Sequence, residues 1–292
     1  MIDPKRIAKF KLKPGKKVRL KDHDTAWRPE GDEAEAVTEE SMAKNLDLLN
    51  EAQGKLYAGD QWSILVVLQA MDAAGKDGLV KHVMSGLNPQ GCHVHAFKAP
   101  SAEEIDHSFL WRCMRVAPAR GTITIFNRSH YEEVLVVKVH EEFLSKQKLP
   151  SKLIHKNIWK ERYEDINNFE LHLARNGTRI IKIFLNVSKE EQKQRFLERL
   201  DKPAKNWKFS LGDLAERKFW DDYMAAYEEM LTATSTKHAP WYVIPADHKF
   251  VARAAVAEIL TNTILDLAVD YPKVSKEAKL AFTDAREKLV SE

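Results

Sequence analysis

The pattern of hydrophobic and polar positions along the chain predicts strands that alternate with helices. Short apolar runs, typical of buried strands, occur at 64–69, 92–98, 121–126, 178–186 and 241–244. The stretches between them carry apolar residues at every third or fourth position, which is typical of amphipathic helices. The predicted helices cover 38–57, 76–87, 101–117, 130–146, 157–175, 188–200, 213–231 and 248–268.

This alternation predicts an α/β fold with a mostly parallel five-stranded sheet and helices on both faces, because parallel strands need crossover connections that cover the sheet. Residues 1–60 are expected to form an N-terminal extension and a helix, with prolines breaking 1–37 into an extended arm. Residues 61–270 form the main domain. Residues 271–292 form a charged tail that is mobile or loosely helical.

The stretch 62–81 has the order of elements found in a P-loop: a strand, a loop of small residues, a Gly-Lys pair and a helix. Small side chains let backbone N–H groups approach phosphate oxygens, while the helix N-terminus and the lysine add positive charge. The residues expected to bind phosphate here are Ala73, Ala74, Gly75, Lys76, Asp77 and Gly78.

Two positions depart from the common form G-x-x-x-x-G-K-[ST]. Ala70 stands in place of the first glycine, and Asp77 in place of the hydroxyl residue that binds Mg²⁺. Asp72 lies inside the loop, where phosphate would repel it unless a divalent cation lay between them, so we interpret it as a metal ligand. The alternative is an ordinary strand–turn–helix corner with an incidental Gly-Lys pair and Asp72 as a helix cap.

A second signal follows the strand 121–126. Asn127 occupies the position where an aspartate usually helps to hold Mg²⁺, and Arg128 could form two hydrogen bonds with phosphate. Glu132 and Glu133 could complete a metal or acceptor site. Alternatively, Asn127 simply ends the strand and Arg128 is a surface cation.

A third signal is the basic stretch at about 190–212, which could form a helical lid that closes on the transferred phosphoryl group. Arg195 and Arg199 are four residues apart and share a helix face. The further cations of this stretch are Lys202, Lys205 and Lys208. The alternative is a solvated helix whose cations pair with Glu191 and Glu198.

A polyanionic substrate would require more cations along one channel. The candidates are Lys81 and His82 on the helix after the P-loop, with Arg112 and Arg115 before the third strand. Helix faces often carry such cations without a function. His93 and His95 lack a third ligand and are best explained as surface histidines.

Composition excludes some classes of protein. The net charge is only +3, which argues against a nucleic-acid-binding protein, and 44% hydrophobic with 30% charged residues is ordinary for a soluble globular chain. Cys92 and Cys113 match neither a disulfide framework nor a zinc site. No apolar segment resembles a signal peptide or a membrane span, so we expect a cytoplasmic protein without a membrane partner.

Several strings of the chain together resemble the polyphosphate kinase 2 family: L-Q-A-M-D-A-A-G-K-D-G, N-P-Q-G, F-K-A-P-S-A-E-E-I-D-H-S-F-L-W-R, I-F-N-R-S-H-Y-E-E-V-L-V-V-K-V, R-Y-E-D-I-N-N-F-E, W-K-F-S and A-P-W-Y-V-I-P-A-D. The resemblance runs from about residue 40 to 268 without large gaps. It implies a P-loop kinase-like three-layer fold with a helical lid. It also implies an enzyme that moves phosphoryl groups between inorganic polyphosphate and nucleotides, with Mg²⁺ or Mn²⁺.

The resemblance assigns roles to individual residues. Asp72 matches the Walker A aspartate that helps to hold the metal, and Lys76 matches the loop lysine on the phosphates. Arg128 matches the Walker B arginine. Arg195 and Arg199 match the arginines of the lid helix.

Asn127, where most of the family has aspartate, together with Glu132 resembles the subgroup called class III. That subgroup is described as phosphorylating both nucleoside monophosphates and diphosphates. The implied substrates are polyphosphate, AMP, ADP and ATP, with guanosine nucleotides as further candidates. The family also suggests a homo-oligomer, either a dimer or a tetramer.

Two other functions compete with this interpretation. A nucleoside monophosphate kinase that uses nucleoside triphosphates would share the fold and lid, but would be expected to carry a hydroxyl residue where this chain has Asp77. A non-enzymatic module could bind polyanions through the lid cations. The small net charge argues against that module.

Overall fold

The computed structural model describes Ile2 and residues 4–292. Its centre is one five-stranded sheet with the strand order β2-β3-β1-β4-β5, and each neighbouring pair is parallel. The strands are β1 (Ser63–Gln69), β2 (Cys92–Ala96), β3 (Ile123–Asn127), β4 (Thr178–Asn186) and β5 (Trp241–Pro245). The predicted α/β fold with a five-stranded parallel sheet is confirmed.

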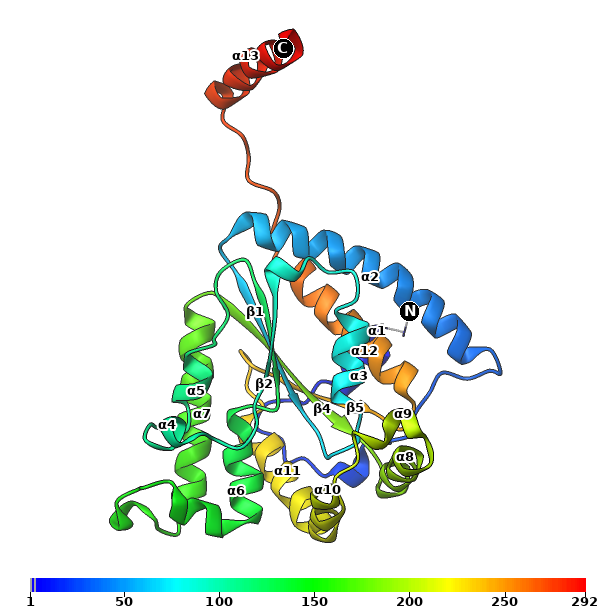
Figure 1. The fold of residues 1–292 in the computed structure, drawn as a ribbon, viewed down its shortest axis with the longest axis vertical. Helices are drawn as coiled ribbons and strands as arrows, with labels where there is room; N and C mark the ends of the chain where they lie inside the picture. The colour runs from blue at the N-terminus through cyan, green and yellow to red at the C-terminus, as the bar shows by residue number, and fades with distance from the viewer. Residues whose placement is uncertain (1, 3) are drawn as a thin grey trace.

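Helices cover both faces of the sheet and make a three-layer structure (Figure 1). The first face carries α2 (Ala34–Gly59), α3 (Lys76–Val83) and α12 (Lys249–Leu265), with α12 packed against both of the others. The second face carries α7 (Ile158–Arg175) and α11 (Trp220–Thr234), which pack against each other. Because both faces are covered, the central strands are continuous apolar runs.

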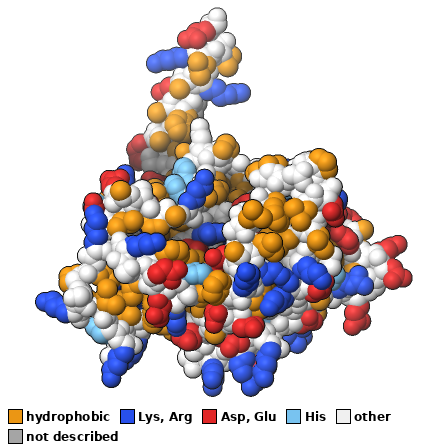
Figure 2. Space-filling view, turned by 60° about the horizontal axis from the view of Figure 1, so that its bottom comes forward, with side chains coloured by type: hydrophobic (Ala, Val, Ile, Leu, Met, Phe, Trp, Pro, Cys, Tyr) orange, Lys and Arg blue, Asp and Glu red, His pale blue; other side chains and the backbone are white. Residues whose placement is uncertain are grey.

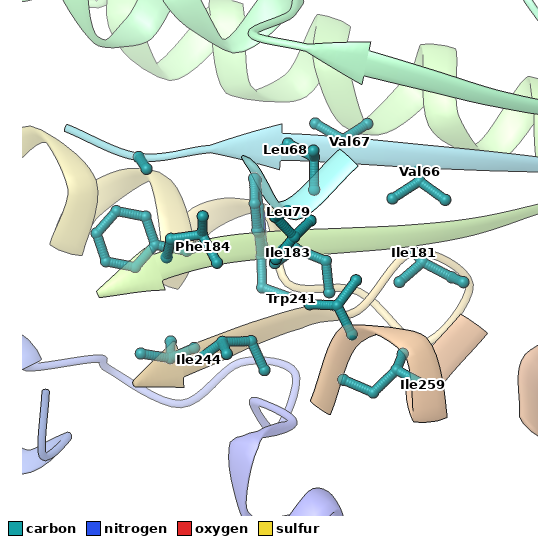
Figure 3. Close-up of a cluster of buried hydrophobic side chains, with 14 of the residues drawn as sticks. Val66, Val67, Leu68, Leu79, Ile181, Ile183, Phe184, Trp241, Ile244 and Ile259 are labelled. Carbon is teal, nitrogen blue, oxygen red and sulfur yellow. The ribbon is translucent and has the colours of Figure 1, made fainter. Parts of the chain in front are cut away.

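The core lies between the sheet and these helices. Every residue of β1 is buried, and Val66, Leu68 and Ile183 belong to a cluster that the helices close (Figure 3). Trp241 of β5 is fully buried within the same cluster. The edge strand β2, in contrast, leaves its side chains exposed or half-buried. This difference explains why β1 has the clearest sequence pattern.

The other elements lie at the two ends of the chain or between these strands and helices. The α-helices among them are α1 (Pro4–Phe10), α4 (Ala102–Ile105), α5 (Trp111–Met114), α6 (Val136–Val139), α8 (Lys189–Asp201), α9 (Pro203–Asn206), α10 (Leu211–Glu216) and α13 (Lys276–Ser291). The 3₁₀ turns are Leu20–Asp22, Pro89–Gly91, His130–Val134, Glu141–Lys146, Ser151–Leu153 and Arg217–Phe219. Helices α8, α9 and α10 occupy the predicted lid segment.

Two predicted helices are wrong. The stretch 101–117 forms α4 and α5 instead of one helix: Ser101 begins α4 with a capping box, and the chain turns again before α5. The stretch 130–146 forms two 3₁₀ turns separated by α6. The sequence around α6 is rich in valine, a poor helix former, which favours short turns over one long helix here.

The N-terminal arm packs along β5, the edge strand opposite β2. Leu12 N–H donates a hydrogen bond to Trp241 O (2.9 Å), and Lys11 forms an antiparallel bridge with Tyr242 of β5. The arm begins with α1 rather than being extended throughout. Covering β5 in this way removes an exposed strand edge, which would otherwise invite pairing with another chain.

At the other end of the chain, α13 lies away from the three layers at the end of an extended segment (Figure 1). Among the residues described, no helix combines the length and the apolar character that crossing a lipid bilayer would require.

A buried ion pair fixes the second face of the sheet. Lys182 of β4 donates hydrogen bonds to Glu170 of α7 (2.6 Å), to the hydroxyl of Tyr131 (2.8 Å) and to Thr234 O (2.6 Å). The Lys182 and Glu170 side chains are both 0% exposed. Burial opposes ionisation of Glu170, but Lys182 and His130 outweigh it and lower the pKa of this carboxyl group.

We expect Lys182→Met to lower the free energy of unfolding by about 3–5 kcal/mol, because it leaves the Glu170 carboxylate buried without its cation. Urea unfolding measures this change. The matched control is Lys160→Met, which removes an ion pair whose lysine side chain is 80% exposed. The control is expected to change stability by less than about 0.5 kcal/mol, and equal effects of the two variants would contradict the prediction.

Candidate active site

The candidate site lies at the carboxyl ends of β1 and β3, where the strand order reverses. Strand β1 has β3 on one side and β4 on the other, so the chain leaves β1 at a topological switch point. Ligands bind in the crevice at such points in parallel sheets. Leu68 near the end of β1 pairs in register with Asn127 at the end of β3. This register brings the P-loop and the residues after β3 together.

The loop between β1 and α3 has the bent backbone of an anion-binding loop. Gly75 has φ +110°, which a side chain would strain, and α3 begins directly after it at Lys76. Ala73 also has a positive φ, of 60°. That conformation costs a residue other than glycine about 1–3 kcal/mol and persists only where the surroundings enforce it. The first N–H groups of α3 have no partner within the helix.

Lys76 folds back over this loop. Its Nζ donates hydrogen bonds to Ala70 O (2.7 Å) and Met71 O (3.3 Å). Burial lowers the pKa of Lys76, Arg128 acts in the same direction, and Asp72 opposes both. The ammonium group therefore lies at this bend, with a pKa below that of an ordinary lysine.

Asp72, Arg128 and Glu132 form one chain of charges. Arg128 donates to Asp72 Oδ1 (2.7 Å), and its second terminal nitrogen lies 3.9 Å from Glu132 Oε2. These side chains line a pocket together with Tyr223 and Tyr227. Burial raises the pKa of Glu132, while Arg128 and Lys76 act against that rise. Arg128 also has a positive φ, of 59°, so two strained residues lie at the same site.

Asn127 contacts Asp77, which stands where a P-loop usually has a serine or threonine. Its Nδ2 donates to Asp77 Oδ1 (2.8 Å), which links the end of β3 to the first turn of α3. With its nitrogen held there, the amide oxygen of Asn127 is available as an acceptor or a metal ligand.

The donor set fits a magnesium ion that arrives with phosphate. Mg²⁺ is usually held by one or two carboxylates, with substrate phosphates and water completing its octahedron. Asp72 supplies a carboxylate that is about a quarter exposed. Throughout the described part of the chain, no group of three or more His, Cys, Asp or Glu side chains could hold a metal by itself.

A cavity of about 200 Å³ lies between the P-loop, α8 and α12. It is rich in cations, and those among its lining residues are Arg195, Arg199, Lys205, Lys208, Lys249 and Arg253. The face drawn in Figure 2 shows Lys and Arg side chains interspersed with acidic ones. Positive charge is nevertheless concentrated at this cavity, although the net charge of the chain is only +3.

Arg195 is placed differently from a phosphate ligand. Its side chain is 6% exposed, and all of its N–H groups donate to Glu191 or to backbone carbonyls, including Ala73 O and Ala74 O. No donor is left for phosphate in this conformation. Arg199, in contrast, lines the cavity while it contacts Lys208 O and Asp213.

Four other predicted cations line neither the cavity beside α8 nor the pocket around Arg128: Lys81, Arg112, Arg115 and Lys202. Arg112 and Arg115 form ion pairs with Glu104 and Glu103, beside β2. Lys202 pairs with Glu198 (2.6 Å). The predictions that these cations bind phosphate remain predictions.

Sequence reasoning missed Lys249 and Arg253 at the start of α12, and Gln192 on α8. The two cations could have been found, because they follow the carboxyl end of β5 and lie four residues apart on one helix face. No sequence signal identifies Gln192, whose amide donates to Asp72 O (3.0 Å).

The parallel sheet, the anion-binding bend and the lid segment together define a P-loop phosphotransferase. Comparison with known families is more specific: the family model described as polyphosphate kinase 2 (PPK2) matches residues 31–272. The chain therefore belongs to the polyphosphate kinase 2 family, and it is a polyphosphate-dependent nucleotide phosphotransferase.

Individual relatives agree with this assignment. The chain is 46% identical over 282 residues to an ADP-polyphosphate phosphotransferase of Rhodopseudomonas palustris, covering 96% of this chain and 97% of the relative. It is 43% identical over 269 residues to an AMP/ADP-polyphosphate phosphotransferase of Meiothermus ruber, covering 91% and 96%. The crystal structure of polyphosphate kinase 2 from Arthrobacter aurescens matches with a TM-score of 0.85 and 40% identity, covering 94% of this chain and 95% of that one.

The lowered pKa of Lys76 predicts a pH dependence. We expect kcat/KM for polyphosphate, which reports the free enzyme, to fall on the alkaline side below the ordinary lysine pKa of about 10.4. The sign follows from the charge: Lys76 loses its proton, and with it its attraction for phosphate, as pH rises. A pH–rate profile checks this. Lys76→Arg stays protonated, so its residual activity should lack this decline. A wild-type profile that stays flat to about pH 10 would contradict the prediction.

Proposed function

We propose that this enzyme transfers the terminal phosphoryl group of inorganic polyphosphate to both AMP and ADP, giving ADP and ATP. The observation that carries the proposal is the Asp72–Arg128–Glu132 chain of charges beside the P-loop. The presence of both Asn127 and Glu132 in the sequence resembles class III, and this resemblance supports activity on both acceptors. The relatives' names include both an ADP and an AMP/ADP phosphotransferase.

In the proposed reaction a terminal phosphate oxygen of the nucleotide attacks the end phosphorus of polyphosphate in line, and the bond to the next phosphate breaks. The P-loop N–H groups and Lys76 hold the phosphates, and Arg128 neutralises charge on the moving group. No covalent enzyme intermediate and no strong general base are needed, because a phosphate oxygen is already anionic.

A magnesium or manganese ion would be held by Asp72 and the Asn127 amide oxygen, and would supply positive charge that neutralises the phosphates. Glu132 would orient Arg128. Of the lid cations, Arg199 and Lys208 are proposed to contact the chain of phosphates; their position in the lining of the cavity supports this role. We also propose a homo-oligomer, which the family resemblance suggests.

The acceptor range is tested by mixing the protein with AMP, Mg²⁺ and long-chain polyphosphate and following nucleotides over time. We expect ADP to appear first and ATP afterwards. A parallel reaction without polyphosphate controls for nucleotide exchange. Formation of ADP alone, or of ATP only when ADP is supplied, would refute the double acceptor range. Turnover with ATP and AMP but not with polyphosphate would instead support a kinase that uses nucleoside triphosphates.

The proposed metal role is tested with Asp72→Asn. We expect kcat/KM to fall by about 10²–10³-fold, the usual effect of removing one electrostatic stabiliser from a transition state. The Mg²⁺ concentration for half-maximal rate should rise, because a neutral amide binds the cation more weakly. Asp201→Asn, at the end of the lid helix, is the control and should behave as wild type. A fall in activity with an unchanged Mg²⁺ requirement would speak against a metal ligand at Asp72.

A further inference from the structure

Helix α8 holds three consecutive carbonyl groups of the P-loop. Gln192 donates to Asp72 O (3.0 Å), and Arg195 donates to Ala73 O (3.1 Å) and Ala74 O (2.6 Å). Gln192 and Arg195 are three residues apart and therefore share a face of the helix. Their side chains are 1% and 6% exposed, so this contact is an internal one.

Arg195 uses its whole hydrogen-bonding capacity in this contact. A guanidinium group has five N–H donors. In addition to the two loop carbonyls, the Arg195 side chain donates to Ala246 O (2.6 Å), Asp247 O (3.1 Å) and Glu191 (2.7 Å). One side chain therefore joins the lid helix, the P-loop and the segment that connects β5 to α12.

The other partners in this arrangement are fixed as well. Gln192 accepts a hydrogen bond from Arg217 (2.7 Å), which orients its amide nitrogen toward the loop. Asp247 accepts from Ser188 N–H (2.8 Å) and from the hydroxyl of Thr25 (2.8 Å). Arg195 is therefore anchored to a segment that is itself held in place.

The direction of these carbonyls determines where the loop can bind anions. Across a trans peptide bond, the C=O of one residue and the N–H of the next point in opposite directions. Because the carbonyls of Asp72, Ala73 and Ala74 point to α8, the following N–H groups point away from it. The Ala74 N–H donates to Met71 O (3.3 Å), which leaves those of Ala73 and Gly75 for an anion. The positive φ of Ala73 needs such external support, since its own side chain disfavours that conformation.

From this geometry we propose that Arg195, assisted by Gln192, is a positioning residue that sets the phosphate-binding shape of the P-loop and couples it to the lid helix. Arg195 acts through backbone carbonyls and does not contact phosphate. The inference rests on the proposed transfer reaction, because it assigns a role within that reaction. It predicts that losing Arg195 impairs the chemical step more than the capture of polyphosphate.

The first test is Arg195→Lys. Lysine keeps the charge but has three donors and no planar fork, so it cannot reproduce the contacts with four carbonyls. We expect kcat to fall by about 10²-fold, as for a small misplacement of reacting groups, while KM for polyphosphate changes by less than threefold. Direct binding of polyphosphate without nucleotide should stay within threefold of wild type. A tenfold or larger loss of binding with kcat retained would show that Arg195 serves polyphosphate binding rather than the chemical step, and would overturn the proposal.

The second test is chemical rescue. Arg195→Ala removes the buried guanidinium group and leaves its carbonyl partners in place, so added guanidinium chloride at low millimolar concentration should restore kcat severalfold. Arg120→Ala is the matched control. It removes an arginine that donates to Gln61 O, at the opposite end of β1, and its activity should not rise with guanidinium. Equal responses of the two variants would overturn the proposal.

Gln192→Leu gives a test that does not depend on the buried charge. It removes the hydrogen bond to Asp72 O together with the one accepted from Arg217, and leaves Arg195 in place. It should lower kcat by about tenfold with KM for polyphosphate unchanged. Thermal unfolding of all variants separates misplacement from loss of fold. If wild type does not use polyphosphate, the proposed function fails. If wild type is active and the Arg195 and Gln192 variants match it, only the inference about α8 fails.

Discussion

The bend between β1 and α3 must present N–H groups and one carboxylate to the same small volume, and the site depends on how that bend is held. Gly75 adopts a left-handed conformation without strain because it has no side chain. Ala73 adopts one as well, and its side chain makes that conformation unfavourable. The bend is held by its neighbours instead: α8 holds its carbonyls, and Lys76 folds over Ala70 and Met71. The binding site is therefore a property of the packed domain rather than of the loop motif alone.

Sequence patterns predict those parts of the structure that depend on local periodicity and burial. The buried run of β1, the small residues of the P-loop and the covered parallel sheet all follow from such patterns, and the structure confirms the fold. The stretches 101–117 and 130–146 are predicted as single helices and are not: the first is divided by a turn between α4 and α5, and the second by two 3₁₀ turns around α6. A pattern of apolar positions does not show where a capping box or a turn divides a segment.

The site shows the same limit at the level of single residues. The sequence identifies Arg195 as a cation on the lid helix. Its partners include the backbone carbonyls of Ala74, which lies 121 residues earlier, and Ala246, which lies 51 residues later. A sequence gives the charge of such a side chain and does not give its partners. Lys249 and Arg253, in contrast, follow the end of β5 and could have been found by considering every strand end.

Two ion pairs of this protein differ in whether their charges can separate. The Lys182–Glu170 pair is fully buried, so separating its charges would be costly and it can only hold the scaffold. The Arg128–Asp72 pair is equally short, but its side chains are 38% and 25% exposed, and pairs of that kind contribute only about 0–1 kcal/mol. In the proposed reaction this weak pair can separate: Arg128 turns to phosphate, and Asp72 turns to the divalent cation that accompanies it. Because it is partly exposed, the pair can balance these two charges in the absence of phosphate without opposing substrate binding, whereas a fully buried pair would block it.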